Sequence, residues 1–203
     1  MKGMKSRTIN QVVALARRQG LLRPRDLVAK DIPRQSLVRA CREGLLEHVG
    51  RGLYRASGAM VTENQSLAEV CKKVPGGAIC LLSALRFHDL TTQNPFEVWL
   101  AIGQKARTPR IDTVAVRAIR FSGDALAQGV ENHKVVGVPI RVYGVAKTVA
   151  DCFKFRNKIG IDVAVEALRD CLKQRKASVD ELMRCARICR VERVMSPYLE
   201  AML

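Results

Sequence analysis

One stretch of this 203-residue chain, IPRQSLVRACREGLLEHVGRGLYRA at residues 32–56, constrains the fold more than any other. Its first half has helical periodicity, because a rotation of 100° per residue gathers apolar side chains on one face. That face holds Leu37, Ala40 and Cys41. Pro33 is expected as the first helical residue and Gly44 as the residue just past the helix end.

After Gly44 the pattern changes to a period of two, which predicts two β-strands. The sequence GRG at residues 50–52 predicts the tip of a hairpin, since glycine takes positive φ without steric cost. A basic helix followed directly by an arginine-tipped hairpin is typical of the recognition helix and wing of a winged helix-turn-helix. Two preceding helices, expected at residues 9–19 and 21–29 after a short basic arm at residues 1–7, complete that layout.

The polar side of the third helix and the hairpin predict a DNA-binding surface. Gln35 and Arg39 are candidates for reading bases, because Gln pairs bidentately with adenine and Arg with guanine. The other arginines are expected to hold phosphates or the minor groove. The full predicted set is Arg34, Gln35, Ser36, Arg39, Arg42, Arg51 and Arg55.

The charge balance supports a polyanionic partner. The chain has 35 Lys and Arg against 19 Asp and Glu, a net charge of +16. Residues 1–56 hold 13 of those cations and four of the anions, so the charge density is highest where the DNA-binding helix is predicted. Double-stranded DNA is therefore the expected partner.

The remainder of the chain predicts a second domain. Strand-like runs at residues 96–102, 113–121, 133–136 and 138–144 are followed by four helical patterns from residue 146 to the end. Ser178 and Glu181 have the spacing of a capping box. The expected fold is α+β, with a winged helix-turn-helix at residues 1–58 and a mixed α/β domain with a helical tail at residues 61–203.

This second domain has no motif that predicts catalysis, a metal site or a cofactor. Asp151 shares a helix face with Lys147 and Lys154, and surface ion pairing is the favoured interpretation of that spacing. His88 and Asp89 are neighbours on one helix and point about 100° apart. A second basic surface that could meet RNA or flanking DNA is expected at Arg117, Arg120, Lys147, Lys154, Arg156 and Lys158.

Seven cysteines without C-x-x-C spacing indicate reduced thiols. Five of them lie in apolar stretches: Cys41, Cys71, Cys80, Cys152 and Cys171. Cys185 and Cys189 are four residues apart on a predicted helix and could share a metal, but the scattered histidines do not favour zinc. No run approaches the roughly 18 apolar residues of a membrane-spanning helix, and no signal peptide is recognisable. A cytoplasmic protein without membrane partners is expected.

Three blocks of sequence add a family resemblance. The winged-helix segment, the block LLSALRFHDLTTQNPFEVWLAI at residues 81–102 and the block VPIRVYGVAKTVADCFKFRNKIGIDVAVEALRDCL at residues 138–172 together resemble the AbiEi antitoxins. These are transcriptional regulators of bacterial abortive-infection, or type IV toxin–antitoxin, systems of phage defence.

The resemblance implies a repressor that binds inverted repeats in its own promoter. It also implies a C-terminal domain that counteracts a nucleotidyltransferase-like toxin. Three alternatives stay open: a regulator without a toxin partner, an RNA-binding module, and a nucleic-acid-processing enzyme to which the winged helix delivers DNA. The enzyme alternative would depend on Asp151 or His88.

Overall fold

The computed structural model describes residues 2–60 and 62–203, with side chains from residue 7 onward. The fold is mixed α+β, and it divides into two compact units. The first unit takes the chain up to Lys73 together with Ile111–Val114 and Lys134–Ile140, and the second takes the rest. The sequence predicted two domains that fold independently, with a boundary at residues 58–61. The division into compact units does not test independent folding, so this boundary stays a prediction.

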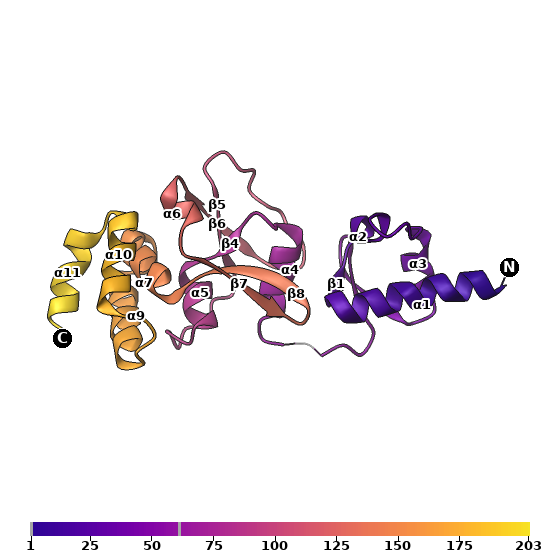
Figure 1. Cartoon of the computed structure of the whole chain (residues 1–203), viewed down its shortest axis with the longest axis horizontal. Helices are drawn as coiled ribbons and strands as arrows, with labels where there is room; N and C mark the ends of the chain where they lie inside the picture. The colour runs from indigo at the N-terminus through magenta and orange to yellow at the C-terminus, as the bar shows by residue number, and fades with distance from the viewer. Residues whose placement is uncertain (1, 61) are drawn as a thin grey trace. The chain divides into compact units, whose positions relative to one another are not determined.

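The first unit begins with helices and short strands that alternate along the chain (Figure 1). They are α1 (Lys2–Gln19), β1 (Leu21–Leu22), α2 (Pro24–Val28), α3 (Gln35–Arg42), β2 (Leu46–Gly50), β3 (Leu53–Ala56) and α4 (Gln65–Lys73). The three strands form an antiparallel sheet in the order β1-β3-β2. The β2–β3 hairpin turns at residues 51–52, as the sequence predicted.

Three expectations for this unit are wrong in detail. The helix predicted from Ile9 begins at Lys2 and so includes most of the expected basic arm, of which Met1 lies outside the described residues. Leu21 and Leu22 form a strand instead of opening a helix, because their backbone pairs with β3. The third helix begins at Gln35, two residues after Pro33, where a turn with Ser36 N–H bonded to the Pro33 carbonyl precedes it.

The core of this unit lies between α1, α2, α3 and the sheet. It is built by side chains such as Val12, Leu27, Leu37 and Leu46, each at most 3% exposed. These are the apolar positions of the helical and strand periodicities, so burial of one face of each element holds α3 against α1.

Gly44 ends α3 with a left-handed conformation, as predicted, at φ +70°. The Leu45 N–H donates to the Ala40 carbonyl at 2.9 Å and the Gly44 N–H to the Cys41 carbonyl at 3.0 Å. This pair of bonds is the Schellman motif, which satisfies carbonyls at the helix end.

Replacing Gly44 by alanine is expected to lower the free energy of unfolding by about 1 kcal/mol. A Cβ at this position meets nothing within 4 Å, so the cost is conformational only. Chemical denaturation would measure it. Gly76→Ala is the matched control, because Gly76 has no positive φ and its added Cβ also meets open space. Equal losses in the two variants would contradict the prediction.

The second unit holds most of a five-stranded sheet in the order β6-β5-β4-β8-β7, of which residues 134–140 of the β7–β8 hairpin are counted with the first unit. Its strands are β4 (Ala78–Ile79), β5 (Val98–Gly103), β6 (Val116–Phe121), β7 (Val130–Val135) and β8 (Val138–Tyr143). Strand β5 runs parallel to β6 and antiparallel to β4, and β4 runs parallel to β8. Strand β5, which has a neighbour on both sides, is buried over Val98–Ile102, and this matches its continuous apolar sequence.

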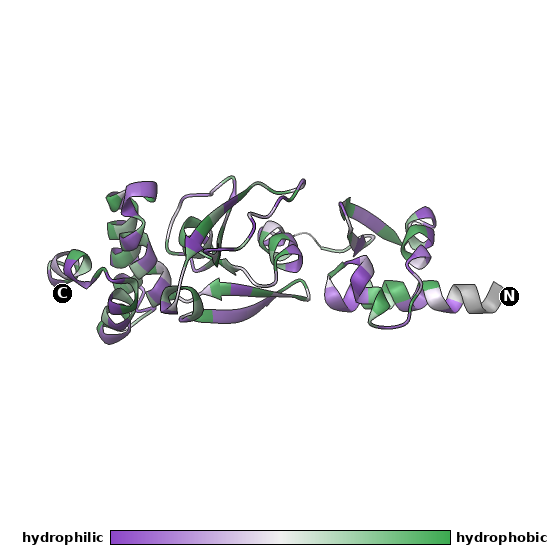
Figure 2. Ribbon diagram, turned by 90° about the horizontal axis from the view of Figure 1, so that it is seen from above, coloured by the Kyte–Doolittle hydropathy of each residue, from purple (hydrophilic) through white to green (hydrophobic). Residues whose placement is uncertain are grey.

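Helices complete this unit and supply most of its core (Figure 2). They are α5 (Leu81–Phe87), α6 (Asp124–Ala127), α7 (Val145–Lys154), α8 (Arg156–Ile159), α9 (Ile161–Lys173), α10 (Val179–Cys189) and α11 (Glu192–Glu200). Helix α7 packs against α5, α9, α10 and α11 and is therefore the centre of the helical layer. The Ser178–Glu181 capping box at the start of α10 is confirmed.

The expectations about membrane-spanning helices and about cysteines can be compared with the described residues. No helix within residues 2–60 and 62–203 is long and apolar enough to cross a membrane. The seven cysteines are free thiols, and all but the half-buried Cys41 are buried, as their apolar surroundings predicted.

Candidate nucleic-acid interface

Helix α3 presents a continuous exposed face made by Gln35, Val38, Arg39 and Arg42. The spacing of three, one and three residues keeps these positions on one side of an α-helix. None of the four side chains has an ion pair or hydrogen bond within the part of the chain that the structure describes. The face is therefore free to contact an outside partner.

Val38 is the member of this face that the sequence interpretation missed. It is 49% exposed and lies between the polar side chains of Gln35 and Arg42. Its position could have been found from the same spacing, because residues 35, 38, 39 and 42 follow the periodicity of one helical face. An exposed apolar side chain among cations can contact a thymine methyl group in a major groove.

Ser36 corrects the predicted surface. It was expected on the exposed side of the helix, but it is only 6% exposed. Position 36 lies one turn before Ala40 and next to Leu37, both of which face the core, so packing of α3 against α1 covers the hydroxyl-bearing side chain. Ser36 therefore packs inside the unit, on the buried side of α3, and is not available to DNA.

The hairpin that follows α3 exposes one arginine at its tip. Arg51 lies in the turn between β2 and β3 and is exposed, and Gly52 takes φ +68° to close that turn. Arg34 is also exposed, at the N-terminal boundary of α3. Within the described residues neither arginine is paired with a carboxylate. Both are suited to contacts with phosphate.

Arg55, in contrast, already forms an ion pair within the hairpin. Its Nη2 lies 2.7 Å from Glu47 Oε2 across the β2–β3 ladder, where the two residues are direct partners. The hydrogen bond from Arg55 and one from the Gly58 backbone lower the pKa of Glu47. The side chain of Arg55 is 18% exposed, so it stabilises the hairpin more readily than it reaches a ligand.

Most side chains of the second predicted basic surface already have partners within their own unit. Arg117 Nε lies 2.6 Å from Glu97 Oε1, and the guanidinium lies 4.7 Å from the centroid of the Trp99 ring. Arg120 donates to the carbonyls of Gly103, Gln104 and Ala106 at 3.3, 2.7 and 2.8 Å. Arg120 therefore fixes the loop after β5.

Lys147 is a correction of larger consequence. It was expected at the surface in ion pairing with Asp151, but it is 1% exposed and Asp151 is fully buried. The Lys147 ammonium donates to Asp151 Oδ2 at 2.5 Å and lies 4.0 Å from the centroid of the Tyr143 ring. The ion pair is real, but α7 is covered by neighbouring helices on this face, so the pair sits in the core.

The surroundings of Asp151 define its electrostatics. Burial raises its pKa, while the Lys147 ammonium and a hydrogen bond from Cys189 act in the opposite direction. Burial also raises the pKa of the Cys189 thiol, which stays protonated and donates to Asp151 Oδ1 at 3.1 Å. Both carboxylate oxygens thus have a donor inside the protein.

The remaining members of the second predicted basic surface differ in how exposed their side chains are to solvent. Lys158 is exposed, Lys154 is half-buried, and Arg156 is half-buried with Nη1 donating to the Phe153 carbonyl at 2.9 Å. The sequence could not separate these cases, because the tertiary fold brings the partners of Arg117 and Arg120 to them and buries Lys147.

His88, the other residue of the enzyme alternative, has a structural contact. Its Nε2 lies 2.8 Å from the carbonyl of Tyr143, an arrangement in which the ring N–H donates. Burial lowers the pKa of His88. Over residues 2–60 and 62–203, no group of three or more His, Cys, Asp and Glu side chains is placed to hold a metal ion.

Comparison with known proteins gives two findings. The chain is similar in fold to the crystal structure of the RV2827C protein from Mycobacterium tuberculosis, with a TM-score of 0.58 at 14% sequence identity. The similarity covers 95% of this chain and 80% of that one. No curated protein sequence matches the chain.

A family model described as "Transcriptional regulator, AbiEi antitoxin" matches residues 10–57. The matched segment includes the exposed face of α3 and the whole β2–β3 hairpin. This description supports a general role in antitoxin-linked regulation. The resemblance noted in the sequence is confirmed over this segment: residues 10–57 match the model of the AbiEi antitoxin family of transcriptional regulators.

Proposed function

We propose that this protein is a DNA-binding repressor of its own promoter and the antitoxin of a type IV toxin–antitoxin system. The observation that carries the DNA-binding half is the unpaired, exposed face of Gln35, Val38, Arg39 and Arg42 beside the arginine-tipped hairpin. Such a regulator acts in the cytoplasm, where bacterial DNA lies.

The order of elements supports a winged helix-turn-helix at residues 1–58. Helix α1, strand β1, helices α2 and α3, and the β2–β3 hairpin follow one another, and β1 closes the sheet against β3. In this arrangement α3 is the recognition helix in the major groove and the hairpin is the wing over the adjacent backbone. Burial of Leu37 and Ala40 fixes which face of α3 points outward.

The exposed side chains divide by chemistry into two roles. Gln35 and Arg39 suit bidentate contacts with adenine and guanine, and Val38 suits a thymine methyl. Arg34, Arg42 and Arg51 are assigned to phosphates, which set the register of the protein on the duplex. Arg55 is assigned to the hairpin because Glu47 holds it.

The antitoxin role is assigned to the domain proposed at residues 61–203. Its support is the description of the family matched by residues 10–57 and the sequence blocks at residues 81–102 and 138–172. The functional partner would be a nucleotidyltransferase-like toxin encoded beside this gene. Lys158 and Lys154 are the members of the second basic surface that stay candidates for contact with a toxin or RNA.

Titration of the full chain onto duplex DNA from upstream of its own gene tests the DNA-binding half. The affinity should exceed that for a shuffled duplex by roughly 10³-fold or more at physiological salt. Three phosphate contacts per bound chain predict that the logarithm of the association constant falls with the logarithm of salt at a slope near −3, by about −0.9 per contact. Fluorescence anisotropy at several salt concentrations would measure both.

The shuffled duplex is the control for purely electrostatic binding. Equal affinity for the two sequences would contradict a promoter-specific repressor, and a slope near zero would contradict the phosphate contacts.

A further inference from the structure

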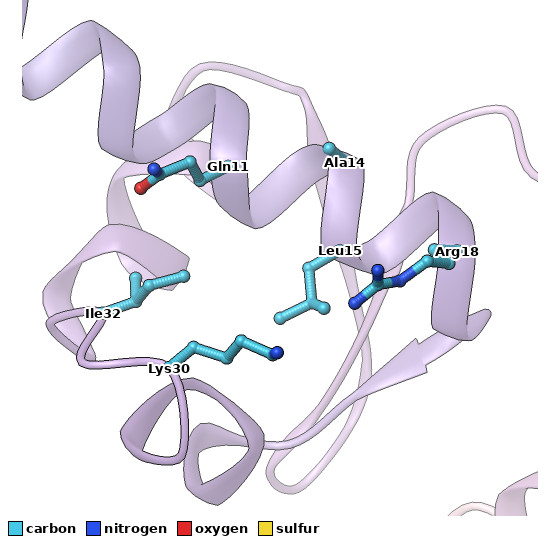
Figure 3. Close-up of a pocket in the computed structure, with 6 residues that line it drawn as sticks. All are labelled: Gln11, Ala14, Leu15, Arg18, Lys30 and Ile32. Carbon is cyan, nitrogen blue, oxygen red and sulfur yellow. The ribbon is translucent and has the colours of Figure 1, made fainter.

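A pocket lies in the first unit between α1 and the turn that joins α2 to α3 (Figure 3). Its volume is about 360 Å³, within the range of small-molecule sites. Six residues line it: Gln11, Ala14, Leu15, Arg18, Lys30 and Ile32. This surface is separate from the exposed face of α3, since the two share no residue.

The two cations of the pocket converge on one space. Figure 3 shows the Arg18 guanidinium and the Lys30 ammonium entering the space from opposite walls, close to Leu15. Neither side chain forms an ion pair or hydrogen bond within residues 7–60 and 62–203. Two unneutralised cations that face one cavity attract an anion, and an arginine fork can hold a carboxylate or phosphate bidentately.

The rest of the pocket wall is apolar. Leu15 is 6% exposed, and with Ala14 and the half-buried Ile32 it gives the cavity an apolar lining beside the cations. Gln11 adds one amide that can donate or accept. A fully hydrated ion would leave this lining uncovered, so the complementary ligand has an apolar body attached to its anionic group.

The walls are preorganised by backbone hydrogen bonds. Residues 11, 14, 15 and 18 form one face of α1. The opposite wall is a tight turn, in which the N–H groups of Lys30 and Ile32 both donate to the Leu27 carbonyl, at 2.9 and 3.0 Å. Leu27 is fully buried, and Asp31 takes φ +53° between them. A ligand therefore meets a wall that is already ordered, which lowers the entropic cost of binding.

We propose that this pocket binds a small molecule with one oxyanion group, a carboxylate or a phosphate ester, and an apolar body about the size of one aromatic ring. Arg18 and Lys30 bind the oxyanion, and Leu15, Ala14 and Ile32 contact the apolar body. The convex, polar backbone of DNA does not match this apolar cavity, whereas a compact amphipathic anion does.

Occupancy of the pocket would also act on α3. Lys30 and Ile32 belong to the segment that leads directly into α3, so a ligand held there biases the position of that helix. This regulatory effect rests on the proposed function, whereas the binding event does not.

Isothermal titration calorimetry of the full chain without DNA tests the site, with benzoate, phenyl phosphate, benzamide and inorganic phosphate as probes. Benzoate or phenyl phosphate should bind, and the neutral benzamide should not. Arg18→Gln and, independently, Lys30→Gln should weaken binding by about tenfold or more, because each removes a charge-assisted contact. Arg17→Gln is the matched control, since Arg17 is exposed on α1 outside the pocket.

Three results would overturn the proposal, and a fourth would reassign Arg18 to DNA. One is that neither aromatic anion binds. Another is that inorganic phosphate binds as tightly as phenyl phosphate, which would remove the role of the apolar lining. The third is an equal effect of Arg17→Gln and Arg18→Gln. If instead Arg18→Gln leaves ligand binding unchanged and lowers the salt slope of DNA binding by about one, the cation is a phosphate contact and the ligand site is refuted.

Since calorimetry is done without DNA, a failure of ligand binding and a failure of promoter binding appear in separate measurements. The effect on α3 is then read as the change in promoter affinity at saturating ligand.

Discussion

Lys147→Met should lower the free energy of unfolding by about 3–5 kcal/mol near neutral pH, because it leaves a buried carboxylate without its counter-ion. Asp151 is fully buried, and Lys147 is the charged group that contacts it, at 2.5 Å. Methionine has nearly the volume of lysine, so the loss would come from charge more than from packing. Urea denaturation monitored by circular dichroism would measure it.

The double variant Lys147→Met/Asp151→Ala should recover most of that loss. Removing both charges removes the cost of burying either one, and replacement of buried ion pairs by apolar residues is often neutral. Lys158→Met is the matched control, since Lys158 is exposed on α8, and it should change stability by no more than about 0.5 kcal/mol. A double variant as unstable as the single one would show that the pair does not account for the loss.

The single variant should also become sensitive to pH in a defined direction. Burial raises the pKa of Asp151, and loss of the Lys147 ammonium takes away the largest influence that lowers it. The native state then binds a proton that the unfolded state has released, so stability falls as pH rises from the ordinary carboxyl pKa to the raised one. The slope can reach about 1.4 kcal/mol per pH unit. Lys147→Met should therefore be closest to the wild type in mild acid.

The combined variant Arg39→Ala/Arg51→Ala should lose at least about 100-fold in promoter affinity. Arg39 is assigned to a base and Arg51 to the backbone, and a good bidentate base contact alone is worth about 1–3 kcal/mol. Both side chains are exposed and unpaired within the described residues, so the fold should be unaffected. Fluorescence anisotropy with the promoter duplex measures the affinity, and the thermal midpoint reports the fold.

A charge-matched control separates specific contacts from general electrostatics. Arg169→Ala/Arg193→Ala removes the same charge from exposed positions on α9 and α11. Promoter affinity of this control should stay within about threefold of the wild type. If both double variants lose affinity equally, or if Arg39→Ala/Arg51→Ala binds as the wild type does, the assignment of α3 and the hairpin is wrong.

Much of the first unit could be predicted from local sequence. The hairpin over residues 46–56, the left-handed Gly44 and the inward face of Leu37 and Ala40 all follow from patterns within about ten residues. The capping box at Ser178 is equally local. Such features are determined by backbone preferences and by the periodicity of apolar side chains, which a single sequence displays.

Other features were decided by residues distant in the sequence. Leu21 and Leu22 form a strand only because β3, more than 30 residues later, supplies their hydrogen-bond partners. Arg120 is held by the carbonyl of the last residue of β5 and by two carbonyls of the loop that follows, and Ser36 is buried by packing of α3 within the first unit. The pocket between α1 and the turn after α2 likewise has no signature in the sequence around any one of its residues.

The sequence by itself determined where the helix and hairpin proposed to bind DNA lie, because their chemistry is carried by side chains on one short, periodic segment. Only the tertiary structure decided which cations are free. Lys147 and Lys158 have the same side-chain chemistry in the sequence, but packing of α7 against its neighbours buries the first beside Asp151 and leaves the second on the exposed end of α8. Whether a charged group meets solvent or a buried partner depends on contacts between distant segments, which local patterns do not encode.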